Sequence, residues 1–160
     1  MSTKETHLRR KDRMIDPTDT KKIMETCTYA VFSTADADGF PYGVPISPVV
    51  EEDHIYFHCA NNGRKMENLA QNANTCMTFV SFSEPDGEAF TTRYASAIAE
   101  GSAAFVTDEE EKRHALRLLC QRYTPHTAEA IDAYMEKYWK QTSVVRMEIH
   151  QLCGKANRKP

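Results

Sequence analysis

Residues able to bind or transform a ligand gather in one short stretch, YFHCANNGRKMENL, at 56–69. It contains His58, then Gly63, and directly after the glycine two cations, Arg64 and Lys65. A glycine at a strand-to-helix turn permits a positive φ, and the first amides of a helix bind anions. Two adjacent cations there repel the helix dipole unless an anion is present, and they match the charge of a phosphate. The turn therefore predicts a phosphate site; the alternative is a solvated turn with two surface cations.

The two histidines before this turn admit more than one role. The stretch 54–60 alternates, with apolar residues expected in the core on one face, namely Ile55, Phe57 and Cys59. His58 therefore points away from that core, where it can bind an anion or act as an acid or base; the alternative is a histidine satisfied by the backbone. His54 shares its face, but no third ligand is evident outside the acidic turn at 51–53, so we predict no metal site.

Composition limits the function classes. A chain of 160 residues with 41% hydrophobic residues suits one domain, and a net charge of -3 gives no general basic field for nucleic acid. No apolar run approaches the length of a membrane span and no signal region follows the first charges, so we expect a cytoplasmic protein. Five widely spaced cysteines indicate reduced thiols. The absence of GxSxG, P-loop and strand-linked GxGxxG motifs argues against hydrolase, nucleoside-triphosphate and dinucleotide sites.

Hydrophobic periodicity predicts about six strands and four helices without a repeated strand-helix-strand unit. The expected helices cover 16–27, 62–72, 108–123 and 125–140, and the expected strands cover 29–35, 40–52, 54–60, 75–82, 91–106 and 143–152, with a loop at 83–89. Three prolines, Pro41, Pro45 and Pro48, cannot donate ladder hydrogen bonds, so the strand at 40–52 must be interrupted, bulged or open on one side. These elements predict an antiparallel α+β domain that is barrel-like.

The order of five segments resembles a known family. LRRKDRMI, PYGVPISPVV, IYFHCANNGRKMENLAQNANTCMTF, RYASAIAEGSAAFVTDEEEKRHALRLLCQRY and VVRMEIHQLCGK together resemble the nitroimidazole-resistance-like branch of the pyridoxamine 5'-phosphate oxidase-like, FMN-binding split-barrel superfamily. The resemblance implies an antiparallel split β-barrel with flanking helices. We expect one domain at 9–155, with flexible termini at 1–8 and 156–160. It further implies a homodimer with FMN at the subunit interface. The net charge and the lack of a membrane-length apolar run predict no nucleic-acid or membrane partner.

The resemblance also assigns roles to residues. Arg64 and Lys65 would hold the FMN phosphate, Gly63 would shape the turn, and His58 would be the catalytic candidate beside the cofactor or substrate. Two further segments would run beside the flavin, namely Val44, Pro45, Ile46 and Ser47, and Ser96, Ala97 and Ile98. Arg93 would belong to the same site or to the interface. Trp139 could reach over a partner's flavin, although aromatic residues spaced like Tyr134, Tyr138 and Trp139 also suit a core or dimer face.

The implied chemistry is transfer of a hydride from NAD(P)H to FMN and of electrons onward to an acceptor, such as a nitro compound. Vitamin B6 synthesis is not predicted, because the Arg-x-His pattern of true pyridoxamine phosphate oxidases is missing: Arg146 stands four residues before His150. Two alternatives remain. One is a flavin or haem carrier or sensor with negligible turnover, and the other is a structural or metal-binding domain without a flavin that uses His54 and His58.

Overall fold

The computed structural model describes residues 9–158. Its helices are η1 (Lys11–Arg13), α1 (Pro17–Thr26), α2 (Arg64–Gln71), α3 (Glu109–Tyr123), α4 (Ala128–Tyr138) and η2 (Trp139–Gln141). Its strands are β1 (Ala30–Ala35), β2 (Pro41–Ile46), β3 (Val49–Glu51), β4 (His54–Ala60), β5 (Asn74–Asp86), β6 (Thr91–Phe105) and β7 (Thr142–Asn157). The flexible segment expected at 1–8 lies outside the described residues. Within residues 9–158, no helix is both long and apolar enough to cross a membrane.

All seven strands form one antiparallel sheet in the order β2-β1-β5-β6-β7-β4-β3. Its two edges, β2 and β3, follow each other in the chain and are linked only by Ser47 and Pro48. Because that link spans at most roughly 11 Å, the sheet must curl until its edges lie close together. No ladder joins the two edges within the described chain, so the barrel is split there. The predicted split barrel is confirmed, with seven strands because the proline-rich segment breaks into two.

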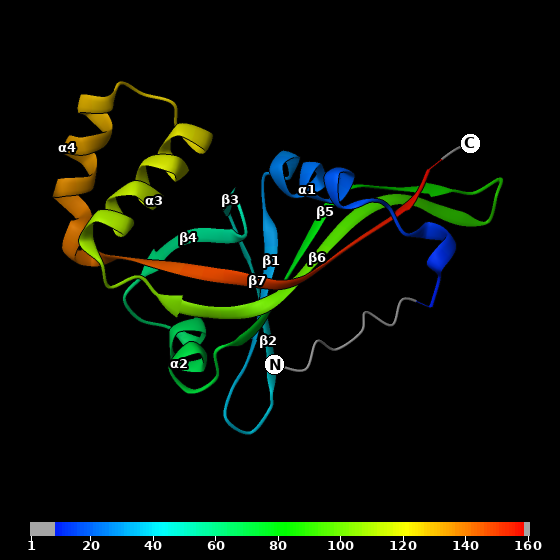
Figure 1. The fold of residues 1–160 in the computed structure, drawn as a ribbon, viewed down its shortest axis with the longest axis horizontal. Coiled ribbons are helices and arrows are strands. Elements are labelled where there is room, and N and C mark those ends of the chain that lie inside the picture. Colours follow the sequence, from blue (N-terminus) through cyan, green and yellow to red (C-terminus); the bar gives the residue numbers. More distant parts are fainter. Residues whose placement is uncertain (1–8, 159–160) are drawn as a thin grey trace.

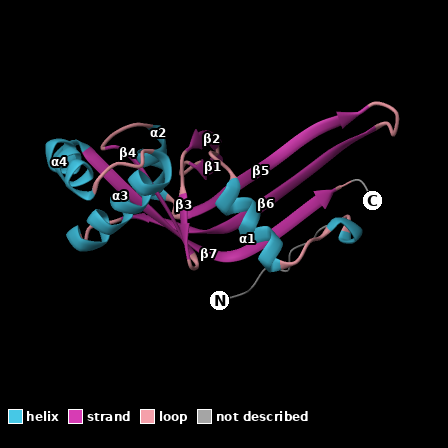
Figure 2. Ribbon diagram, turned by 90° about the horizontal axis from the view of Figure 1, so that it is seen from above, coloured by secondary structure: helices cyan, strands magenta, loops and turns pink. Residues whose placement is uncertain are grey.

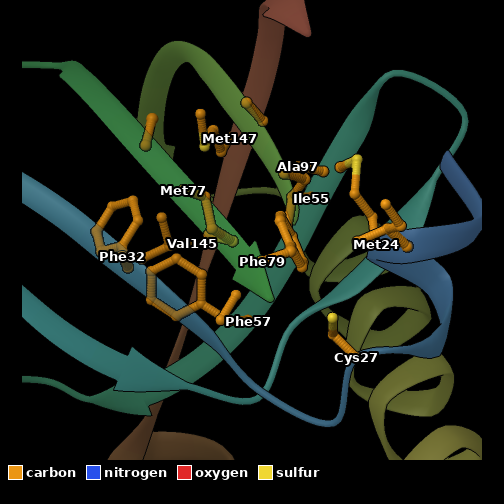
Figure 3. Close-up of a cluster of buried hydrophobic side chains, with 14 of the residues drawn as sticks. Met24, Cys27, Phe32, Ile55, Phe57, Met77, Phe79, Ala97, Val145 and Met147 are labelled. Atoms are coloured by element: carbon orange, nitrogen blue, oxygen red, sulfur yellow. The ribbon is translucent and has the colours of Figure 1, made fainter. Parts of the chain in front are cut away.

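The barrel interior is filled by the residues that alternation predicted. Ile55, Phe57 and Cys59 of β4 all point into it, and the rings of Phe32 and Phe57 lie 4.8 Å apart (Figure 3). Helix α1 begins where expected, because Asp16 accepts a hydrogen bond from the Asp19 amide and Pro17 occupies the first turn.

Helices α1 and α2 complete this core from opposite sides of the strands (Figure 1). Helix α1 contributes Ile23 and Met24, and α2 contributes Leu69. Gly154 of β7 permits the close approach of α1, because a Cβ at this position would overlap the Thr20 hydroxyl.

The opposite face of β4 is covered as well. Helices α3 and α4 pack on it (Figure 1) and enclose a second apolar cluster with strand residues Val49, Tyr56 and Val144 and helix residues Ala115, Leu116, Leu119, Ile131 and Met135. The side chain of His58 therefore points away from the barrel core, as predicted, but toward a helical layer.

The β5–β6 hairpin is longer than the sequence suggested. The loop expected at 83–89 is wrong in its first half, because β5 continues to Asp86 and pairs with β6 up to Thr91. This extension projects away from α3 and α4 (Figure 2) and is bent by an irregularity between Val80 and Phe82. Strand β7 also runs past Lys155: Ala156 and Asn157 pair with β6, so the ordered domain continues into the expected flexible end.

Candidate functional site

The turn before α2 has the geometry of an anion cradle. Gly63 caps the helix with φ +114°, a conformation that strains residues bearing a Cβ. Gly63 offers no side chain to cap the helix, so the first amides of α2 stay available to a ligand. Among residues 9–158, neither Arg64 nor Lys65 forms an ion pair, although Glu67 lies in the same turn. The predicted phosphate site therefore has two cations without ion-pair partners in the described chain, and backbone amides that are free to donate to a ligand.

Contacts of the two cations place this cradle between β2 and β4. The guanidinium of Arg64 lies 4.9 Å from the centroid of the Tyr42 ring, near the start of β2. Lys65 lies close enough to the end of β4 for its charge to act on His58. Ser47, just beyond the far end of β2, shares a cavity with His58. The segment 44–47 thus runs along the open edge of the sheet, from the cradle near Tyr42 toward that cavity.

His58 is exposed to the cavity yet surrounded by protein. Burial lowers the pKa of His58 below its ordinary value, and the positive charge of Lys65 lowers it further. The imidazole is therefore neutral at pH 7, with one nitrogen donating and the other accepting hydrogen bonds. This satisfies the chemical requirement for a residue that exchanges a hydrogen bond or a proton with a ligand.

A cavity of about 600 Å³ opens between β4 and the α3–α4 layer, a size typical of small-molecule sites. It is lined by Ser47, His58, Cys59, Ala60, Leu116, Leu119, Cys120, Tyr123, Thr124, Tyr134, Met135, Tyr138, Gln141 and Thr142. His58 and Ser47 are the predicted site residues that it brings together. Sequence reasoning grouped Tyr134 and Tyr138 with Trp139 as residues suited to a core or dimer face, but did not connect them to His58, because periodicity does not say which sheet face a helix covers.

Asn61 was missed altogether. Its amide nitrogen donates to the carbonyl of Lys140 at 2.8 Å, and its amide oxygen accepts from the Ser143 hydroxyl at 2.8 Å. These bonds fix the loop between β4 and the cradle to the start of β7. The Asn-Asn-Gly sequence signals a turn, but its long-range partners leave no local signal.

Several predicted flavin-contacting residues lie in the sheet. The side chains of Val44, Ile46 and Ala97 face the barrel core, so they can offer a ligand only their backbone. On the opposite, outward face, β-sheet pairing places Pro45 and Ile98 in one row across the sheet. Ser96 lies on that outward face one row away.

Arg93 and Trp139 are held by other contacts. Arg93 pairs with Asp86 at 3.0 Å in the hairpin extension. Trp139 lies against α3, with Lys112 at 4.3 Å and Arg113 at 4.7 Å from its ring. Neither residue lines the cavity. Within residues 9–158, no three His, Cys, Asp or Glu side chains are grouped to hold a metal, so His54 and His58 lack a third ligand.

Comparison with known proteins agrees with this architecture. Residues 16–156 match the family model described as pyridoxamine 5'-phosphate oxidase. No curated protein gives a significant match. Among solved structures, a candidate 5-nitroimidazole antibiotic resistance protein from Bacteroides thetaiotaomicron is 28% identical, with a TM-score of 0.74, over 89% of this chain and 85% of that one.

Two further structures share the fold at lower identity. The flavocytochrome Anf3 from Azotobacter vinelandii is 21% identical with a TM-score of 0.78, over 99% of this chain and 76% of that one. HutZ, the haem storage protein from Vibrio cholerae, is 18% identical with a TM-score of 0.66, over 87% and 94%. Proteins with this fold thus include binders of flavin and of haem.

Proposed function

Because the chain belongs to the pyridoxamine 5'-phosphate oxidase family, we propose that it is an FMN-dependent oxidoreductase that works in the cytoplasm as a homodimer. The observation that carries the proposal is the turn at Gly63, where a positive φ, free helix amides and two cations without ion-pair partners in the described chain converge. Such a donor set fits a phosphate monoester, and FMN has one. Arg64 and Lys65 would hold that phosphate.

The remaining roles belong to the surroundings of the cradle. Bound FMN would supply hydride and electron transfer, which no side chain can provide. The open edge of β2 at 44–47 offers unpaired backbone groups for orienting a ring system. His58, held neutral, can donate a hydrogen bond to the acceptor through one ring nitrogen or accept a proton at the other. Helices α3 and α4 form one wall of the cavity and limit its contact with water.

The proposed donor is NAD(P)H and the proposed acceptor is a nitroaromatic compound. Support for the acceptor comes from the 28% identical neighbour, which is named for resistance to 5-nitroimidazole antibiotics. Reduction of a nitro group consumes electrons in pairs, and a flavin can deliver them from a nicotinamide.

The outward face of the sheet supports the homodimer. It carries apolar side chains that no element of the described chain covers: Val80 is 45% exposed and Ile98 is 38% exposed. Both lie on central strands: Ile98 shares its row with Val31, Thr78 and Cys153, whereas Val80 shares its row with Ser96 and Lys155. A second copy of the sheet would bury this face, and the cofactor would then lie beside the subunit interface.

A second candidate function is a flavin or haem carrier without turnover. The flavocytochrome and the haem storage protein among the structural neighbours favour it. It predicts tight retention of a chromophore that NAD(P)H does not bleach, whereas the oxidoreductase predicts rapid bleaching followed by reoxidation when a nitroaromatic compound is added.

The deciding experiment is the absorption spectrum of purified protein before and after FMN addition and desalting. We expect retained flavin bands at about 370 and 450 nm. Arg64→Ala and Lys65→Ala should each weaken FMN binding by about 1 to 3 kcal/mol through loss of a charge-assisted hydrogen bond. Lys22→Ala, which removes an exposed cation from α1, is the matched control. Colourless protein that retains no FMN would overturn the proposal, and full affinity in both cradle variants would remove the phosphate assignment.

A further inference from the structure

The walls of the cavity between β4 and the α3–α4 layer are uncharged. Helices α3 and α4 contribute apolar side chains, Leu116, Leu119 and Met135, and three tyrosine rings, Tyr123, Tyr134 and Tyr138. The other side chains are small or polar without charge, apart from the imidazole of His58. Among the described residues that line it, none is Asp, Glu, Lys or Arg.

The charged side chains of α3 near the cavity are directed elsewhere, and the one on α4 stays at the mouth. On α3, Lys112 donates to the Trp139 carbonyl at 2.9 Å and Arg122 donates to the Cys27 carbonyl at 2.7 Å. On α4, Lys137 is exposed and lies 5.1 Å from the centroid of the Tyr138 ring. Lys65 acts on His58, but under the proposed function its charge is matched by the FMN phosphate. An anionic group buried in the cavity beside His58 would therefore lack a partner, which makes its burial costly.

The aromatic residues form a mouth and a fixed wall. The rings of Tyr134 and Tyr138 lie 4.7 Å apart, and Tyr134 is 63% exposed, so this pair borders the opening. The Tyr123 hydroxyl donates to the Pro48 carbonyl at 2.6 Å, which holds that ring in place beside the split in the barrel. Rings arranged in this way favour a flat aromatic ligand over a flexible aliphatic one.

We propose that this cavity binds an uncharged, planar aromatic molecule, which Tyr134 and Tyr138 contact at the mouth and His58 meets with a hydrogen bond at the floor. The inference rests on the proposed function in taking that molecule to be the electron acceptor. It makes α4 the element that selects the acceptor, and it excludes acceptors bearing a carboxylate or a phosphate.

Two probes of nearly the same shape test the charge requirement: 4-nitrobenzamide, which is neutral, and 4-nitrobenzoate, which is anionic. Isothermal titration calorimetry should show at least about tenfold tighter binding of the amide, because the carboxylate loses its water without gaining a partner. Equal binding of the two probes, tighter binding of the benzoate, or no binding of the amide would overturn the inference. The measurement is made with FMN added and, separately, with inorganic phosphate in its place, so that the charge of Lys65 is matched in either case. Cavity binding is then read even in protein that retains no flavin, which separates this result from the proposed function.

Variants in the wall sharpen the test. Thr124→Lys places a cation at the C-terminal end of α3, where the helix dipole tolerates it, and Thr124→Met is its uncharged match. The lysine variant should bind 4-nitrobenzoate at least about tenfold more tightly than the methionine variant. Tyr134→Ala should weaken 4-nitrobenzamide binding about three- to tenfold, while Tyr29→Ala, at an exposed tyrosine outside the cavity, should not. Unchanged binding in both Thr124→Lys and Tyr134→Ala would place the ligand elsewhere.

Discussion

At the scale of single residues, His58 lines the cavity, and the charge of Lys65 in the cradle affects its protonation. Folding lowers the pKa of His58 through burial and the charge of Lys65. Between that lowered value and the ordinary value of about 6.5, the unfolded chain binds more protons than the folded one. The free energy of unfolding should therefore fall as the pH drops through about 6.5.

Urea unfolding of flavin-free protein at pH 8 and pH 5.5 measures this effect. We expect His58→Gln to lose less stability on acidification than the unmodified protein, because the variant has no imidazole to protonate. His126→Gln, which changes an exposed histidine between α3 and α4, is the control. An equal loss in the His58 variant and the unmodified protein would show that His58 is not desolvated.

At the scale of elements, Glu111 fastens α3 to the sheet. Its carboxylate accepts hydrogen bonds from the Tyr56 hydroxyl at 3.0 Å and from Arg146 at 2.7 Å, so one side chain joins α3 to both β4 and β7. Burial raises the pKa of Tyr56 to about 12, and the hydrogen bond to Glu111 adds to the shift. The tyrosine therefore remains a donor over the whole physiological range.

Glu111→Ala should lower the free energy of unfolding by about 1 to 3 kcal/mol, because it leaves the buried Tyr56 hydroxyl and the Arg146 charge without their acceptor. Glu111→Gln keeps an acceptor oxygen and should lose less. Urea midpoints measure both variants, with Glu110→Ala on the exposed side of the same helix as control. A double-mutant cycle of Glu111→Ala with Tyr56→Phe measures the coupling energy between the two side chains. A coupling energy of zero would show that the Tyr56–Glu111 hydrogen bond does not hold α3 to the sheet.

Which elements form was largely predictable from local patterns, and the split barrel followed from the family resemblance, whereas the placement of α3 and α4 over β4 was not predicted. Asp16 and Pro17 mark the start of α1, and the alternation of β4 identifies its core face, because both signals are local. The continuation of β5 to Asp86 escaped prediction, since a Pro, a Gly and acidic residues locally favour a loop and only pairing with β6 overrides them. The turn at Gly63 could be identified from adjacent residues alone. The cavity lined by tyrosines could not, because it forms only when α3 and α4 pack over β4.

At the scale of the whole molecule, the proposed dimer can be tested through the outward face of the sheet. Ile98→Lys and Val80→Lys each place a cation on that face, and in a symmetric dimer both copies would carry it into an apolar part of the interface. We expect each variant to weaken dimerisation at least about tenfold in sedimentation equilibrium. His126→Lys adds the same charge outside the sheet and serves as control. A dimer of unchanged strength in both sheet variants would place the interface elsewhere.

The position of β7 in the sheet also sets a condition on synthesis. This strand lies between β6 and β4, and it supplies the ladder that connects the β3–β4 hairpin to the other strands. While a ribosome still holds residues 142–157, β4 and β6 each present a row of unpaired backbone groups, which invites pairing with other nascent chains. The barrel can therefore close only after β7 has emerged, and a chain halted before that point would carry two incomplete sheets with exposed edges.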